Sequence, residues 1–203
     1  MNISTRNVSR LYVAVAAVVT VAGALAQSSS SQTNANYALY GSGNGYIGLN
    51  AGESDFSLNN GTGLFSSEDH DTSYNIYAGS YFNQNFGFEL GYTDFGKIGR
   101  AGGSTKADGV NFSLVGRIPL GSSFNLLGKL GTTYGRTEVS SALGSGVQPG
   151  SENGFGWSYG VGAEYVFNSQ WSAVLQHDAY DLKFVGSGRD RISATTLGFR
   201  YRF

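Results

Sequence analysis

TLGFRYRF, residues 196–203, alternates between two kinds of side chain at every position. The apolar set consists of Leu197, Phe199, Tyr201 and Phe203, and the set between them of Thr196, Gly198, Arg200 and Arg202. Because successive side chains of a β-strand point to opposite faces, this segment predicts a strand with one apolar face and one polar, cationic face. A soluble antiparallel sheet could show the same alternation, so the rest of the chain decides which solvent the apolar face meets.

The N-terminal residues have the three parts of an export signal. Two arginines precede an apolar run over residues 11–22, and Ala24–Ala26 has the small-x-small pattern of a cleavage site. A helix that spans a membrane needs about 20 apolar residues, and this run is shorter. We therefore expect residues 1–26 to be removed as a signal peptide, and the polar, low-complexity residues 27–44 to be a disordered lead-in.

The composition excludes several classes of protein. The chain has no cysteine, which excludes disulfides and thiolate metal sites, and its 31 glycines against two prolines fit turns and strands better than long helices. Only 13% of its residues are charged, below the roughly 25–35% of a well-behaved soluble surface. The mean hydropathy of −0.16 argues against further spanning helices but not against a barrel, whose strands alternate. The net charge of −1 gives no indication of a nucleic-acid partner.

Eight strand-like segments are expected after residue 44, at roughly 45–56, 72–82, 86–96, 109–119, 124–137, 155–167, 171–182 and 192–203. Their connections alternate between tight turns, around 83–85, 121–123 and 168–170, and longer loops rich in Gly, Ser and Asp, at about 57–71, 97–108, 138–154 and 183–191. This asymmetry is typical of outer-membrane barrels, which keep both termini in the periplasm, and a soluble barrel of the lipocalin kind does not require it. The sequence therefore predicts an all-β fold, an eight-stranded antiparallel up-and-down transmembrane β-barrel over residues 45–203.

Aromatic residues gather at the two ends of the expected strands. Phe82, Phe86, Phe124, Phe167, Trp171 and Phe203 flank the tight turns or the C-terminus, whereas Tyr74, Phe95, Tyr134, Phe155 and Trp157 lie near the long loops. Aromatic rings favour the boundary between water and lipid, so two such bands predict the two girdles of a membrane barrel. In a soluble core the rings would concentrate in mid-strand instead.

Three segments resemble the transmembrane domain of OmpA-type outer-membrane proteins. Residues 81–97, YFNQNFGFELGYTDFGK, contain the Gly-Phe-Glu-hydrophobic-Gly-Tyr core of that family as Gly87–Tyr92. Gly160–Tyr165 is similar to its sixth strand and Tyr201–Phe203 to the end of its eighth, and a looser likeness extends over residues 45–203. The resemblance implies a barrel alone, as in OmpX-like and opacity-type surface proteins, without the periplasmic peptidoglycan-binding domain of full-length OmpA proteins.

Parity along the strands assigns an inner face. If Phe88, Leu90 and Tyr92 face lipid, the residues that point inward include Asn50, Glu89, Asn111, Ser113, Arg117, Lys129, Glu164, Gln176, Arg200 and Arg202. Eight strands leave an interior that side chains can fill. Since an unpaired buried carboxylate is costly, we expect Glu89 and Glu164 each to meet a cation, with Lys129, Arg117 and Arg200 as the candidates.

The resemblance implies a role for this inner charge network. In the OmpA family, residues at the positions that match Glu89, Lys129 and Glu164 form a lumen network that can act as a gate. Val115 and Val174 stand where that family has a Lys and an Arg, so Arg117 or Arg200 would have to substitute. Two interpretations stay open: the charged pairs only hold the barrel closed, or they gate a narrow pore.

One outward residue does not fit a lipid-facing position. By parity Glu53 points outward from the first strand, where a charge at mid-bilayer would be costly. It can be reconciled only with a place near the outer rim, at the lipid headgroups.

No catalytic arrangement is predicted. His177 and Asp178 are neighbours in a strand and therefore face opposite sides, and there is no His-x-Ser pair of the deacylase kind. His70 lies in the acidic run 68–71, which could hold a divalent cation but is expected to be a solvated loop. We expect no enzyme activity, no cofactor and no metal site.

These features predict an integral protein of the Gram-negative outer membrane, in contact with its lipid and lipopolysaccharide. Recognition commonly lies in variable polar loops on a rigid scaffold, so its role would be structural or interactive: envelope integrity, adhesion, or contact with host or surface ligands. A narrow channel for small solutes or ions is the alternative, and an outer-membrane enzyme a third. The outward set Leu197, Phe199, Tyr201 and Phe203 is the expected signal to the barrel-assembly machinery.

Overall fold

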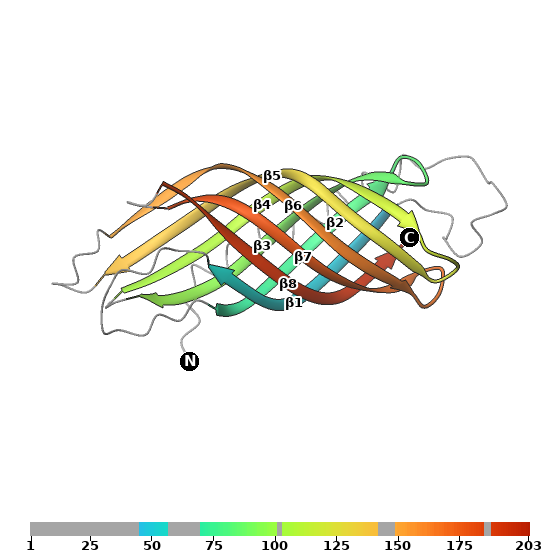
Figure 1. The fold of residues 1–203 in the computed structure, drawn as a ribbon, viewed down its shortest axis with the longest axis horizontal. Coiled ribbons are helices and arrows are strands. Elements are labelled where there is room, and N and C mark those ends of the chain that lie inside the picture. The colour runs from blue at the N-terminus through green and yellow to red at the C-terminus, as the bar shows by residue number, and fades with distance from the viewer. Residues whose placement is uncertain (1–44, 57–69, 101–102, 142–148, 185–187) are drawn as a thin grey trace.

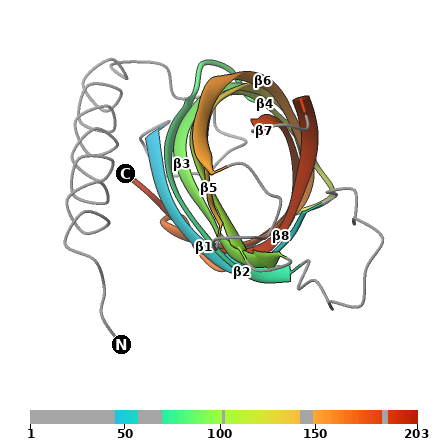
Figure 2. The same cartoon turned by 90° about the vertical axis from the view of Figure 1, so that its left-hand side faces the viewer.

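The described chain forms one closed β-sheet. The computed structural model describes residues 45–56, 70–100, 103–141, 149–184 and 188–203. They form strands β1 Gly45–Phe56, β2 His70–Tyr81, β3 Phe86–Arg100, β4 Gly103–Pro119, β5 Phe124–Ser141, β6 Gly150–Val166, β7 Trp171–Phe184 and β8 Gly188–Arg202. Each strand pairs antiparallel with the next, and β1 also pairs with β8, which closes the barrel (Figures 1 and 2). The described residues include no helix that is long and apolar enough to cross a membrane.

The predicted eight-stranded up-and-down barrel is thereby confirmed, and so are its tight turns. In the first and third turns an asparagine accepts two backbone N–H groups: Asn83 Oδ1 from Asn85 and Phe86, at 2.9 and 2.7 Å. Asn168 Oδ1 does the same for the residues two and three positions later, at 2.9 and 2.8 Å. The shared Asn-x-x-aromatic pattern therefore sets the geometry of both turns. We call this end of the barrel, at the right in Figure 1 with the C-terminus, the turn end, and the opposite end the loop end.

The strands extend further toward the loop end than the sequence predicts. β3 and β4 pair as far as Arg100 and Gly103, so most of 97–108, expected as a loop, is strand. β5 likewise continues to Ser141 and β6 begins at Gly150. Outward-facing residues are polar in these extensions, so the apolar alternation that predicts strands is absent, while the ladder hydrogen bonds continue. Residues 1–44, expected to hold the signal peptide and lead-in, and most of the first expected loop, 57–69, lie outside the described residues.

Two of the eight strand pairs separate before the others. The register of β2 with β3 stops at Tyr74 and Asp94, and that of β6 with β7 stops at Ser158 and Tyr180. The remaining pairs continue further toward the loop end. At this end the barrel is therefore divided into two four-stranded half-sheets, β7-β8-β1-β2 and β3-β4-β5-β6.

Side chains replace the missing ladder between β2 and β3. β3 has a bulge between Asp94 and Lys97, where Gly96 has a φ of 81°, in the left-handed region that favours glycine. The backbone N–H of Lys97 donates to Asp71 Oδ2 at 2.5 Å, and Ser54 Oγ donates to the carbonyl oxygen of Phe95 at 2.5 Å. These bonds satisfy β3 backbone groups that β2 no longer reaches.

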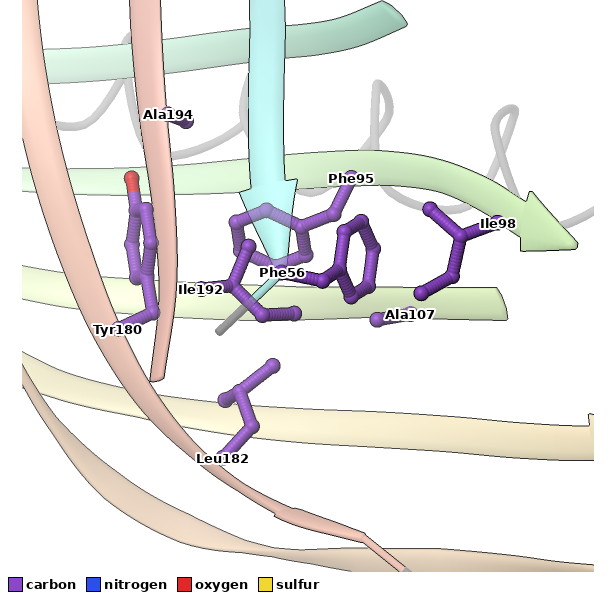
Figure 3. Packing of buried hydrophobic residues seen from close by; sticks show 8 residues of the cluster. All are labelled: Phe56, Phe95, Ile98, Ala107, Tyr180, Leu182, Ile192 and Ala194. Carbon is purple, nitrogen blue, oxygen red and sulfur yellow. The ribbon is translucent and has the colours of Figure 1, made fainter. Parts of the chain in front are cut away.

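An apolar cluster fills the space between the half-sheets. It consists of Phe56, Phe95, Ile98, Ala107, Tyr180, Leu182, Ile192 and Ala194 (Figure 3). The rings of Phe95 and Tyr180, one from each half-sheet, meet edge to face with centroids 4.8 Å apart. This packing corrects the sequence prediction for Phe95, which was assigned to the outer aromatic girdle but is 0% exposed. Phe95 has the parity of Glu89 and Thr93, so the alternation already placed it inside.

The other girdle aromatics face outward as expected. The exposed set comprises Phe82, Phe86, Phe124, Phe167 and Trp171 at the turn end, with Tyr74, Tyr134, Phe155 and Trp157 nearer the loop end. Between them the outer face carries exposed aliphatic residues such as Leu49, Leu130 and Leu197. An outer surface of this kind, apolar with two aromatic bands, suits a bilayer and would be poorly hydrated in water.

Candidate functional site

The candidate site is the charged interior of the barrel. Asn50, Glu89, Asn111, Ser113, Arg117, Glu164, Gln176, Arg200 and Arg202 are buried, and the side chain of Lys129 is 10% exposed. All of them therefore point inward, as parity predicts. Because each strand alternates, the ring of eight strands directs one side chain in two at a common interior.

Glu89, on β3, meets two cations. Lys129 Nζ, from β5, forms an ion pair with Glu89 Oε1, and Arg200 Nη2, from β8, lies 3.5 Å from Oε2. The hydroxyl of Tyr46 donates to the same Oε2 at 3.2 Å. A buried carboxylate is strongly unfavourable unless it is paired and hydrogen-bonded, and Glu89 is both.

Glu164, on β6, is fully buried and has the larger set of partners. Its Oε1 lies 2.5 Å from Arg202 Nη2 and 3.3 Å from Arg200 Nη1. Ser172 Oγ donates to the same oxygen at 2.8 Å, and Asn125 Nδ2 donates to Oε2 at 2.7 Å. Both carboxylate oxygens are thus bonded, which fixes the side chain in one position.

Arg200 connects the two carboxylates and is surrounded by tyrosines. Its guanidinium carbon lies 4.1 Å from the ring centre of Tyr46 and 5.3 Å from that of Tyr77, and Nη1 donates to the hydroxyl of Tyr81 at 3.4 Å. Aromatic faces attract a desolvated guanidinium, which offsets part of the cost of burying Arg200. Sequence reasoning missed these tyrosines, although Tyr46 has the same parity as Asn50.

Arg117 lies at the edge of this network. Its Nε and Nη2 donate to the carbonyl oxygen of Gln84, in the first tight turn, at 3.2 and 2.8 Å. Its guanidinium carbon is 4.1 Å from the ring centre of Tyr81. Of the five residues predicted for the charge network, the structure brings four into direct contact, Glu89, Lys129, Glu164 and Arg200, and adds Arg202. Arg200, rather than Arg117, links the two carboxylates.

Asp178 is an inward carboxylate that sequence reasoning missed. It is 8% exposed and lies two residues after Gln176, so the same parity could have found it. Its side chain faces a polar cavity lined by Asn75, Glu89, Gly91, Asn111, Ser113, Lys129, Ser158, Tyr159, Asp178 and Tyr180. The space open to the centre of a water molecule is about 10 Å³, room for about one water. The arrangement can hold charges and about one water.

The two histidines lie apart in the described chain, His177 on β7 and His70 at the start of β2. His177 is exposed on the outer face, with Nδ1 2.9 Å from Thr195 Oγ1, whereas Asp178 is inside, so the predicted separation of these two neighbours is confirmed. Across the described ranges no group of three His, Cys, Asp or Glu side chains is placed to hold a metal ion. His70 is exposed at the start of β2, and the rest of its acidic run, apart from Asp71, lies outside the described residues.

The C-terminal set lies on the outer face beside the turn end. Leu197 and Phe199 are about 60% exposed, and the ring of Tyr201 packs on Trp171 with centroids 5.0 Å apart. The backbone N–H of Phe203 donates to the carbonyl oxygen of Gly45 at 3.2 Å, which joins the first and the last of the described residues. All four side chains are therefore on the bilayer face, and their role in assembly stays a prediction.

Comparisons with known proteins give a consistent result. The model of the family described as "Outer membrane protein beta-barrel domain" matches residues 14–203. Outer membrane protein A of Yersinia pseudotuberculosis is 27% identical over 140 residues, which cover 62% of this chain and 39% of that protein. Among solved structures, Neisserial surface protein A superimposes with a TM-score of 0.62 at 16% identity, over 79% of this chain and 97% of that one. Ail of Yersinia pestis does so with a TM-score of 0.52 at 19% identity, over 78% and 99%.

Proposed function

This chain belongs to the outer membrane protein beta-barrel domain family, and from that premise we propose that it acts as a closed scaffold with a structural or surface-interaction role. It is an integral protein of the Gram-negative outer membrane, of the OmpA and OmpX type. Envelope integrity, adhesion and contact with host or surface ligands are the activities that such a scaffold can support. Because the chain spans about two fifths of the OmpA relative that it matches, none of these activities transfers from that relative directly.

The single observation that carries the proposal is the filled interior. A charged layer around Glu89, Glu164 and Arg200 lies toward the turn end, and the apolar cluster around Phe95 lies toward the loop end. Solutes would have to cross both layers. An interior filled in this way supports a scaffold rather than an open pore, which is the usual outcome for eight strands.

A surface role is supported by the strand extensions at the loop end. On β6, residues Gly150–Asn153 are exposed and pair with β5, whereas the register with β7 begins only at Ser158 and Tyr180. A strand edge without its ladder partner can add an extended peptide from another protein. The charged outward residues Asp108, on β4, and Arg136, on β5, lie toward the loop end, where they would meet water rather than lipid.

The experiment for this role compares bacteria that express the intact chain with bacteria that express a shortened barrel. In the shortened form the hairpin 139–150 is replaced by a two-residue Asn-Gly turn. A heat-sensitive gel shift serves as the control that both forms fold. We expect the shortened form to lose attachment to host cells or extracellular matrix. Equal attachment of both forms would contradict an interaction role for this hairpin.

A narrow gated channel is the second candidate, and the polar cavity beside Glu89, Lys129 and Asp178 is the observation that favours it. Single-channel recording from the refolded mature chain, Gln27–Phe203, distinguishes the two. We expect a silent bilayer, because two layers close the interior. Discrete openings that change in Glu164→Gln would instead support a gated pore.

We include no catalytic role in the proposal, because the two histidines are both exposed in the described chain and neither meets an inward carboxylate.

Outer-membrane lipid and lipopolysaccharide are the surroundings of the barrel's apolar outer face. Recognition by the barrel-assembly machinery through Leu197, Phe199, Tyr201 and Phe203 remains part of the proposal. Replacement of Phe203 by Ser should slow folding in cells more than folding into pure lipid vesicles.

A further inference from the structure

The loop-end part of β7 lies beneath β6 rather than beside it. We call residues Asp181–Phe184 of β7, together with their β8 partners Gly188–Arg191, the hairpin end. Beyond the last rung of the β6–β7 ladder, the backbone of β7 passes on the interior side of β6. A Cβ built on the buried Gly156 of β6 would overlap the carbonyl oxygen of Asp181. The backbone of β7 therefore occupies the space into which a side chain at Gly156 would point.

Contacts with β5 hold the hairpin end in this place. Thr137 Oγ1, on β5, donates to the carbonyl oxygen of Lys183 at 2.8 Å. Leu182 is 1% exposed within the apolar cluster (Figure 3), and its Cγ lies 3.3 Å from the Cβ position of Gly135, on β5. Neighbouring strands are about 4.8 Å apart, so β5 and β7 would be about 10 Å apart if β6 lay between them. These direct contacts therefore place the hairpin end inside the sheet.

Two glycines of β6 make room for the hairpin end. Gly154 and Gly156 have the inward parity of Ser158. The Cβ position of Gly154 is 2.9 Å from Cδ of Lys183. A glycine inside a strand often marks the close approach of another backbone. A side chain at 156 would meet such a backbone atom, whereas a side chain at 154 would meet the far part of a flexible side chain.

The sequence of β7 also fits a continued ladder with β6. If the register of the last rung is extended toward the loop end, Gly156 meets Leu182. One position further, Phe155 meets Lys183. Parity is kept, since Leu182 stays on the inner face and Lys183 joins Phe155 on the outer face. This ladder would pair backbone groups of both strands, at the loss of the contacts with β5.

We infer that the hairpin end has two positions, tucked against β5 or paired with the edge of β6, and that the choice between them regulates this edge. The inference rests on the proposed function, in which the edge of β6 adds an extended peptide. The tucked position leaves the edge at Gly150–Trp157 free, whereas in the paired position Asp181–Phe184 of the same chain occupies it. Pairing with β7 and addition of a peptide therefore exclude each other, and a bound peptide favours the tucked position.

The chain has no cysteine, so two cysteine pairs report the two positions. In Gly135→Cys with Leu182→Cys, a sulfur replaces the Cγ that lies 3.3 Å from the other Cβ, close to the separation of about 3 Å in a disulfide. In Phe155→Cys with Lys183→Cys, the sulfurs meet only in the paired position, because the tucked Lys183 side chain lies on the inner side of β6.

Both chains are refolded into phospholipid vesicles without any partner and oxidised with copper phenanthroline, and free thiols are counted over time. We expect the disulfide of the first pair to form about tenfold or more faster than that of the second, because the structure has the tucked position. No disulfide in the first pair would overturn the inference.

Gly156→Ala, added to each cysteine pair, tests the switch, and Gly154→Ala is the matched control. The methyl group at 156 overlaps a backbone oxygen only in the tucked position, so the first disulfide should form about tenfold or more slowly and the second faster by a similar factor. The methyl group at 154 displaces only the flexible Lys183 side chain and should leave both rates nearly unchanged. If Gly156→Ala slows the first pair without speeding the second, there is no paired position and the inference is overturned.

An attachment assay tests the regulation and separates it from the proposed function. Bacteria that express each disulfide-locked pair are compared with bacteria that express the intact chain or the shortened barrel. We expect the tucked, locked chain to attach like the intact chain, and the paired, locked chain to attach as weakly as the shortened barrel. Equal, strong attachment of both locked chains would overturn the regulation and leave the interaction role standing.

Failure of the proposed function has a different signature in the same assay. If the intact chain attaches no better than the shortened barrel, the proposed function fails and the regulation falls with it. The rates of disulfide formation, measured without a partner, still decide whether the hairpin end has two positions. The heat-sensitive gel shift confirms folding for every variant.

Discussion

Two glutamate–arginine pairs have the same N–O distance but differ in burial, so they distinguish the effect of burial on stability from the effect of contact. Glu164 and Arg202 approach to 2.5 Å with side chains 0% and 5% exposed, and Glu138 and Arg136 approach to 2.5 Å with side chains 38% and 39% exposed. The buried pair holds its charges away from water, so its loss removes the Glu164 carboxylate from both Arg202 and Arg200 and leaves Arg200 with Glu89 as its carboxylate partner. The exposed pair leaves both ions hydrated when it breaks.

Glu164→Gln should therefore lower the free energy of unfolding by about 3–5 kcal/mol, whereas Glu138→Gln should change it by about 0–1 kcal/mol. Glutamine keeps the shape of the side chain and an oxygen that can accept from Ser172 or Asn125, so the loss reports the charge. Urea unfolding in lipid vesicles, followed by tryptophan fluorescence, measures both. Equal losses would show that burial does not decide the contribution of these pairs.

A second residue-scale prediction concerns the space that the tyrosines around Arg200 occupy. A Cβ added to Gly48 would lie 2.1 Å from Cζ of Tyr77, whereas a Cβ on Gly128 would meet nothing within 4 Å. Gly48→Ala must displace a buried ring, so we expect a loss of about 1–3 kcal/mol in unfolding free energy. Gly128→Ala is the matched control, and a similar loss there would mean that the backbone rather than Tyr77 sets the cost.

At the scale of the strands, the division into two half-sheets decides which aromatic residues stabilise the loop end. Phe95 is 0% exposed between the half-sheets, and Phe155 is 65% exposed on the outer face. Phe95→Ala removes a packed ring and should cost about 3–5 kcal/mol. Phe155→Ala removes a ring that is largely exposed and packs on Tyr134 at the outer face, so its cost in the same urea titration should be clearly smaller. A larger loss for Phe155→Ala would contradict the assignment of Phe95 to the interior.

The bridge between β2 and β3 gives a prediction for a single backbone group. The N–H of Lys97 donates to a carboxylate oxygen of Asp71 in place of a ladder bond. In Asp71→Ala this N–H has no carboxylate acceptor, so its hydrogen exchange should accelerate by tenfold or more. A tenfold acceleration corresponds to about 1.4 kcal/mol of lost local stability. The amide of Leu130, on β5, lies in a continuous ladder and serves as the internal control. Unchanged exchange at Lys97 would mean that another group accepts its hydrogen.

At the scale of the whole molecule, the interior has two successive layers that differ in chemistry. In the closed scaffold that we propose, the charged layer would exclude solutes by filling space with paired ions, and the apolar cluster would exclude ions because it cannot hydrate them. Either layer alone should be enough to prevent leakage. Glu164→Gln and Phe95→Ala should each leave planar bilayers silent, whereas the double variant should conduct. Glu164→Gln combined with Phe155→Ala is the control, and conductance in that control would place the barrier in the charged layer alone.

The alternation of side chains determined a large part of this structure by itself. The run from Leu197 to Phe203 and its counterparts predicted eight strands and the inward orientation of Glu89, Lys129, Glu164 and Arg200. Parity is a local property of the extended backbone, so it needs no knowledge of the neighbouring strands. Where parity was not applied to every residue, the predictions were incomplete or wrong: Asp178 was missed and Phe95 was placed on the outer girdle.

Only the tertiary structure decided which of these residues meet. That Arg200 joins both carboxylates, that Arg117 turns to the first tight turn, and that β2 leaves β3 at Tyr74 depend on the register between strands far apart in the sequence. The register that pairs His177 with Thr195, and Thr195 with Glu53, arises for the same reason, because these residues come from three strands. Side-chain parity follows from the chain alone, whereas register follows from how eight strands close on one another, and the closed ring fixes it only when all pairs form together.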